Sequence, residues 1–176
     1  MSETLPSREQ ALQLLREHGC SAKVINHCKA VAELAVETAN ILKDKGFQIN
    51  SELVKIGALL HDIGRSKTHA VNHVVVGAEI AESAGLPDSI VSIIKRHVGG
   101  GITIAEAEKL GWPKDVYMPI TLEEKVVSYA DKLIENSKRA PIDLTIKKLS
   151  GELKWEAAKR VQKLHEEITS LIGGVP

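Results

Sequence analysis

The chain has 176 residues, of which 43% are hydrophobic, a size and composition suited to one globular domain with one core. Only 3% of the residues are aromatic, so packing falls to Ala, Leu, Ile and Val, which favours helices. Lys and Arg number 23, as do Asp and Glu. A formal net charge of zero excludes the long-range basic field that attracts nucleic acid or anionic membranes. An anionic ligand must therefore be held locally, by a metal ion or a few placed cations.

The two cysteines, Cys20 and Cys28, lie in a segment of helical periodicity. Their spacing is not that of a close zinc pair, and two thiols do not make a disulfide framework. We therefore expect free thiols in a reducing compartment. The polar N-terminus does not resemble a signal peptide, and no apolar run has the length of a transmembrane helix. The sequence thus predicts a cytoplasmic protein with no membrane partner.

Helical periodicity covers the first half of the chain. Ser7 and Gln10 have the pattern of a capping box at the start of a helix. Ser51 is expected to cap the helix that leads to His61, and Gly64 to stop it, because glycine adopts positive φ without strain. The expected helices cover residues 7–19, 21–46, 51–61, 73–84 and 87–97.

The second half begins with a break at Gly99 to Gly101, followed by a short expected helix over 103–110. Thr121 and Glu124 form a second capping-box pattern. After Pro141 one final helical stretch carries an apolar stripe that includes Leu153, and we expect it to pack on the core rather than form a dimer seam. No alternating strand pattern of useful length is present. The predicted fold is all-α, one domain over residues 1–176.

Polar side chains occupy positions where core residues are expected. His27 shares a helix face with Val24 and Val31, His61 and Asp62 end an apolar run, and Asp131 adjoins a second stripe. Each taken alone has an ordinary structural explanation: a hydrogen-bonded core histidine, or a carboxylate at the edge of a stripe. Together they indicate a shared divalent cation, because buried histidine and carboxylate groups need partners.

The pattern His27, His61-Asp62, Asp131 resembles the HD-domain metal-dependent phosphohydrolases, as do its contexts His-Asp-Ile-Gly-Arg and Ser-Tyr-Ala-Asp-Lys. The resemblance implies a helical bundle of the HD-domain type, with a core over about 20–140 and a C-terminal extension over 141–176. It also implies hydrolysis of a phosphate ester or anhydride by metal-activated water. Two imidazoles and two carboxylates suit Fe, Mn, Zn, Co or Ni.

Two more histidines, His73 and His97, lie where family members with two metals take ligands for the second ion. The resemblance therefore implies one or two ions, with two favoured, and Asp62 as bridging ligand and catalytic residue. The other reading is that His73 and His97 face solvent or bind substrate phosphate. The implied partner is a small phosphorylated molecule, most readily a nucleotide, and not nucleic acid. A homodimer is possible.

Within the family, the sequence is most similar to the symmetrical dinucleoside tetraphosphate hydrolases. It departs from that branch in Ile63-Gly64-Arg65, after the His-Asp pair, and in the glycine triplet after His97. Four cations are expected to bind substrate: Arg65, Lys67, Lys132 and Arg139. Trp112 and Tyr117 either stack on a base or anchor the core or a loop. Two other functions stay open: a di-iron oxygenase on the same scaffold, and a nucleotide-binding sensor without turnover.

Overall fold

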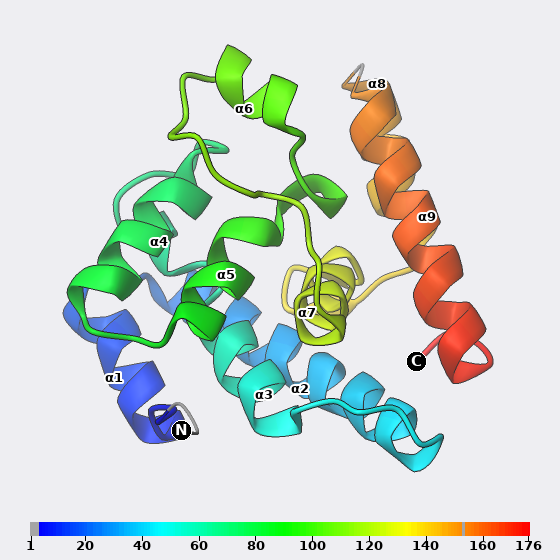
Figure 1. The fold of residues 1–176 in the computed structure, drawn as a ribbon, viewed down its shortest axis with the longest axis horizontal. Coiled ribbons are helices and arrows are strands. Elements are labelled where there is room, and N and C mark those ends of the chain that lie inside the picture. The colour runs from blue at the N-terminus through cyan, green and yellow to red at the C-terminus, as the bar shows by residue number, and fades with distance from the viewer. Residues whose placement is uncertain (1–3, 153) are drawn as a thin grey trace.

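A computed structural model describes residues 4–152 and 154–176, so Leu153 of the predicted stripe lies outside the described residues (Figure 1). The elements in chain order are α1 (Arg8–Glu17), α2 (Ala22–Asp44), α3 (Ser51–Leu60), η1 (Ile63–Ser66), α4 (His73–Ser83), α5 (Asp88–Arg96), η2 (Val98–Gly100), α6 (Ile104–Lys109), α7 (Leu122–Lys132), β1 (Ile134–Glu135), β2 (Lys138–Arg139), α8 (Ile142–Gly151) and α9 (Trp155–Ile172).

The long helix α2 forms the base of the bundle and contacts α3, α7 and α9. α3 also packs on α1 and α5, and α4 packs on α5. Aliphatic side chains fill the space between these helices, among them the buried Leu34, Leu59, Ile93 and Val127. The all-α prediction is confirmed. No helix in the described part of the chain is both long and apolar enough to cross a membrane.

The helix starts follow local side-chain chemistry. Both predicted capping boxes are present: the Ser7 hydroxyl accepts a hydrogen bond from the Gln10 amide, and Thr121 pairs in the same way with Glu124. The predicted cap at Ser51 is wrong. The N-cap of α3 is Asn50, one residue earlier than predicted. Its Oδ1 accepts hydrogen bonds from the amides of Glu52 and Leu53, two of the N–H groups that have no partner within the helix.

The predicted role of Gly64 as a positive-φ helix stop is also wrong. α3 ends at Leu60, and Gly64 lies inside η1 without a positive φ. A Cβ added to Gly64 would lie 1.9 Å from the carbonyl oxygen of His73 and 2.7 Å from the amide nitrogen of Gly77. Gly64 is therefore required because η1 and the backbone of α4 touch there. That contact brings Asp62 next to His73.

The region after α7 differs from the predicted single helical stretch. A two-residue antiparallel hairpin pairs Ile134 with Arg139 and Glu135 with Lys138. It turns at Asn136 and Ser137, which both have positive φ. Two helices, α8 and α9, then follow. The apolar stripe of α9 packs on the core through the buried residues Val161, Leu164 and Ile168.

Candidate metal centre

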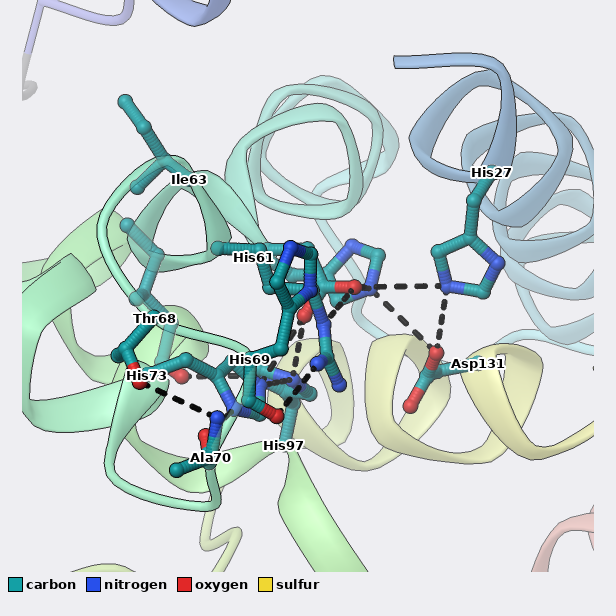
Figure 2. Close-up of polar contacts among 12 residues, drawn as sticks. His27, His61, Ile63, Thr68, His69, Ala70, His73, His97 and Asp131 are labelled. Carbon is teal, nitrogen blue, oxygen red and sulfur yellow. Dashed lines mark hydrogen bonds and ion pairs between the residues drawn. The ribbon is translucent and has the colours of Figure 1, made fainter. Parts of the chain in front are cut away.

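Six histidine and aspartate side chains converge from five helical elements, which Figure 1 shows as a ribbon. Figure 2 shows His27, His61, His73, His97 and Asp131 as sticks pointing toward one another. They lie in the first half of α2, at the α3–η1 junction, at the start of α4, directly after α5 and in the last turn of α7. The residues are His27, His61, Asp62, His73, His97 and Asp131. All six are the ligands that the sequence predicts, and the tertiary structure places them together.

The first group of donor atoms surrounds one point. His27 Nε2 lies 2.9 Å from Asp131 Oδ1 and 3.7 Å from Asp62 Oδ2. His61 Nε2 lies 3.4 Å from Asp131 Oδ1 and 3.6 Å from Asp62 Oδ2. The donor atoms of His27, His61 and Asp131 all lie within 4.8 Å of one another and could hold a metal ion. Asp62 Oδ2 lies next to both histidine nitrogens of this group.

The second group uses the other oxygen of Asp62. Asp62 Oδ1 lies 3.1 Å from His73 Nε2 and 3.4 Å from His97 Nε2. The two histidine nitrogens are 3.3 Å apart. Because Asp62 Oδ2 belongs to the first group and Oδ1 to the second, this carboxylate joins the two groups as a bridging ligand does.

The backbone orients three of the histidine rings. The Nδ1 atoms of His61, His73 and His97 lie 2.6, 2.8 and 2.7 Å from the carbonyl oxygens of residues 58, 70 and 94. A ring that donates its Nδ1–H to a carbonyl presents the lone pair of Nε2 on its other side, the arrangement typical of metal-binding histidines. The repeated contact three residues back therefore aims three Nε2 lone pairs at the centre of the cluster.

This arrangement leaves polar atoms without hydrogen-bond partners. His61 Nε2 and Asp62 Oδ1 are buried and have no hydrogen bond within the described part of the chain. The lone pairs of His73 Nε2 and His97 Nε2 face each other at 3.3 Å. Buried acceptors in mutual contact repel each other, and a bound cation would remove that repulsion. The donor set therefore fits one or two divalent metal ions.

The protonation states agree with a ligand role. Burial favours the neutral form of Asp62, but the charge of His61 and the adjacent rings of His73 and His97 hold its pKa well below its usual range. Burial acts likewise on Asp131, and Lys132 together with His27 and His61 lowers its pKa well below normal. Burial lowers the pKa of His97 to about 4. Both carboxylates are thus ionised and His97 is neutral at pH 7, the forms that bind metal.

His61 behaves differently from His97. Burial opposes its protonation, but the charge of Asp62 and contacts with Cys28 and Asp131 raise its pKa well above the ordinary value. Two carboxylates beside the buried imidazole of His61 stabilise a positive charge on its Nε2. Either a proton or a metal ion can supply that charge, so the two compete for the same nitrogen.

The four predicted substrate cations divide into two groups. Arg65 Nε donates to Asp62 Oδ2 at 2.8 Å, and Lys132 Nζ donates to Asp131 Oδ2 at 2.5 Å and to the His97 carbonyl at 3.1 Å. These two lie at the cluster and hold its carboxylates. Lys67 is exposed, and Arg139 pairs with Glu37. Neither Lys67 nor Arg139 is among the described residues that line the adjoining cavity.

That cavity has a volume of about 1080 Å³ and reaches the metal centre. His27, Asp62 and Asp131 form part of its wall, with Arg65 and Lys132. Sequence reasoning missed the remaining wall, which comes largely from α6, the hairpin, α8 and the start of α9. Trp112 and Tyr117 instead contact each other with ring centroids 5.0 Å apart, and Tyr117 is buried, so they anchor a loop.

Comparisons with known proteins agree with this geometry. The model of the family described as HD domain matches residues 24–136. An uncharacterized protein of Methanocaldococcus jannaschii is 48% identical over 93% of this chain and 98% of its own length. A tRNA (cytidine(56)-2'-O)-methyltransferase of Thermoplasma volcanium is 42% identical over 96% of this chain. The chain spans only 48% of that methyltransferase, about half its length.

Solved structures share the fold. The HD domain of the L. monocytogenes phosphodiesterase PgpH, in complex with cyclic-di-AMP, superimposes with a TM-score of 0.57. The match covers 93% of this chain and 96% of that one, at 21% identity. At this identity the likeness extends to the fold alone.

Proposed function

Because the chain belongs to the HD domain family, we propose that it is a metal-dependent phosphohydrolase acting on a small phosphate ester or anhydride. The observation that carries the proposal is the sharing of Asp62 between two donor groups, with Oδ2 facing His27 and His61 and Oδ1 facing His73 and His97. His27, His61, Asp62 and Asp131 would hold one divalent ion, and His73, His97 and Asp62 a second.

A divalent ion held there would supply two effects: a lower pKa of water, and polarisation of a phosphoryl oxygen. The residues of the chain contribute order and charge. Asp62 lies between the two donor groups and would hold the two ions at a fixed separation, and this is the catalytic role we assign to it. Arg65 and Lys132 fix the two carboxylates through charge-assisted hydrogen bonds at 2.8 and 2.5 Å. Both cations line the cavity, so they also balance the negative charge of a phosphoryl group entering it.

The size of the cavity supports a substrate larger than phosphate. Ligand sites for small organic molecules measure roughly 300–1,000 Å³, and this cavity holds about 1080 Å³. We therefore propose a nucleotide as substrate. Dinucleoside tetraphosphates belong among the compounds tested, because the sequence around His73, His97 and Asp131 resembles that branch of the family.

The test begins with protein purified without chelator or added metal. Element analysis should find one or two transition-metal ions per chain. Mn, Co or Ni should then support hydrolysis of compounds in a panel of nucleotides, measured by the appearance of phosphate or of shorter nucleotide products. His27→Ala should abolish activity, whereas His18→Ala, at the end of α1, should not. Metal-free protein that gains no activity with any of these ions would refute the proposal.

The two other functions have distinct signatures. A di-iron oxygenase would consume oxygen when loaded with iron and lose activity under argon. A sensor would bind nucleotide tightly, with metal present, and release no product after long incubation. Hydrolysis of a nucleotide under argon would exclude both.

The methyltransferase relatives raise tRNA as another substrate, since a sequence like this one forms about half of their length. Binding to tRNA rests largely on phosphate contacts from Lys and Arg and weakens steeply with salt. A chain with a formal net charge of zero is poorly suited to it. We propose a small nucleotide instead. Anisotropy of labelled tRNA at 50 and 200 mM salt tests this: salt-dependent binding at micromolar protein would favour tRNA.

A further inference from the structure

One wall of the cavity beside the candidate metal centre comes from outside the HD domain match. The family match ends at residue 136, but residues of α8 and of the first turn of α9 line the same cavity as His27, Asp62 and Asp131. α8 packs on α9, and α9 packs on α7, which carries Asp131 (Figure 1). The C-terminal helices therefore take part in forming the site whose chemistry the HD residues supply.

Trp155, the first residue of α9, is the aromatic side chain in this wall. It is 55% exposed, although tryptophan usually buries most of its surface. The chain has two tryptophans, and the other, Trp112, packs on Tyr117 and does not line the described cavity. Leu149 lies in the same wall. A flat apolar ring is thus more than half exposed in a cavity that three of the candidate metal ligands, His27, Asp62 and Asp131, also line.

Several cations of the described cavity wall are free to bind phosphate groups. Arg65 and Lys132 already hold ligand carboxylates, and Arg160 pairs with Glu106. Lys23, Lys109 and Lys148 line the cavity with no ion pair among the described residues. Such cations suit the phosphates of a ligand that reaches from the metal centre toward Trp155.

We propose that Trp155 stacks on the base of a nucleoside phosphate whose phosphate group lies at the metal centre, so that α8 and α9 select nucleotides over simple phosphate esters. This inference rests on the proposed function and names its substrate class. Base stacking on aromatic side chains is sequence-tolerant, because every base has a π-face. Trp155 is a binding residue that positions the substrate and takes no part in the chemistry.

A second copy of the chain is the other candidate to cover Trp155. The immediate neighbours of Trp155 on the cavity wall argue against it, since Glu152, Lys154 and Glu156 are all charged. The buried centres of protein interfaces are depleted of such residues. The concave setting beside metal ligands fits a small molecule better than a flat protein surface.

Fluorescence provides a binding test that does not need turnover. The Trp112→Phe variant keeps an aromatic ring against Tyr117 and leaves Trp155 as the single tryptophan. Metal-loaded variant is titrated with the four nucleoside 5'-monophosphates and, as a matched ligand without a base, with ribose 5-phosphate. We expect saturable quenching by the nucleotides and none by ribose 5-phosphate. Unchanged circular dichroism and melting temperature verify the fold.

Substitution of the ring then separates stacking from general packing. In the wild-type background, Trp155→Ala should weaken nucleotide binding measured by calorimetry by about tenfold, within the range for base–aromatic stacking. Trp155→Phe should restore most of it, and ribose 5-phosphate should bind all three proteins equally. In turnover assays Trp155→Ala should raise KM for nucleotides and leave kcat unchanged.

The outcomes distinguish this inference from the proposed function. Equal quenching by ribose 5-phosphate, or Trp155 fluorescence that changes with protein concentration instead of nucleotide, would overturn the stacking proposal and leave phosphohydrolysis standing. The second result would assign the surface to a second copy. Base-dependent quenching without hydrolysis of any nucleotide would support stacking and overturn hydrolysis alone.

Discussion

Gly64 offers the sharpest test of how the site is assembled. In Gly64→Ala the new Cβ would meet two backbone atoms of α4, the His73 oxygen at 1.9 Å and the Gly77 nitrogen at 2.7 Å. Real Cβ contacts essentially never fall below 3.0 Å, so η1 and α4 must separate by about 1 Å. No flexible side chain can absorb this shift, because both contacts are with backbone.

The expected cost follows from the geometry. Overpacking of a core costs about 1–3 kcal/mol, and a clash with backbone belongs at the upper end, at about 3 kcal/mol. For a chain of this size that corresponds to a loss of roughly 6–12 °C in melting temperature. The same separation displaces His73 Nε2 from Asp62 Oδ1, which are 3.1 Å apart. We therefore expect loss of the second metal as well as lower stability.

Urea denaturation followed by circular dichroism measures the stability, and element analysis the metals per chain. Gly151→Ala is the matched control, because a Cβ at Gly151 meets nothing within 4 Å. Alanine replaces glycine at this helix terminus, so stability should stay equal or rise by up to about 1 kcal/mol. A Gly64→Ala protein within about 0.5 kcal/mol of wild type, with its full metal content, would refute the close-packing explanation.

Three other predictions follow from the site and its surroundings. Dialysis against EDTA should lower the melting temperature by roughly 5–10 °C, since a ligand at 100 times its Kd stabilises by about 2.7 kcal/mol; no shift would mean that the cluster binds no metal. His73→Ala should reduce the metal content from two ions per chain to one, and a wild-type content of one would contradict the second site. Burial, with the charges of Cys28 and Asp62, raises the pKa of Cys20 to about 11. Its thiol should stay protonated, and iodoacetamide should label it slowly from pH 7 to 9 until urea unfolds the chain; fast labelling of native protein would contradict this.

Local chemistry explains what the sequence predicted well. Capping at Ser7 and Thr121 involves residues three positions apart, and helical periodicity needs only neighbours along the chain. Four of the six candidate ligands, His27, His61, Asp62 and Asp131, were accessible for a related reason, whereas His73 and His97 came from the family resemblance. Polar residues placed on apolar stripes are visible without knowing what they contact. Motif resemblance then supplied the common purpose of those residues.

Tertiary contacts decided the remainder. His27 and Asp131 are 104 positions apart and meet at 2.9 Å only because α2 packs on α7. In the sequence Gly64 looks like a helix stop, but glycine is required there because the backbone of α4 lies against it. Arg139, close to Asp131 in sequence, turns away on a hairpin to pair with Glu37.

The sequence by itself determined the helical class and which residue types could hold a metal, because both depend on local pattern and on side-chain chemistry. Only the tertiary structure decided which oxygen of Asp62 faces which histidines, and that Trp155 shares a cavity with them. Those facts depend on distances between segments far apart in the chain. Such distances arise from packing, which no stretch of sequence specifies alone.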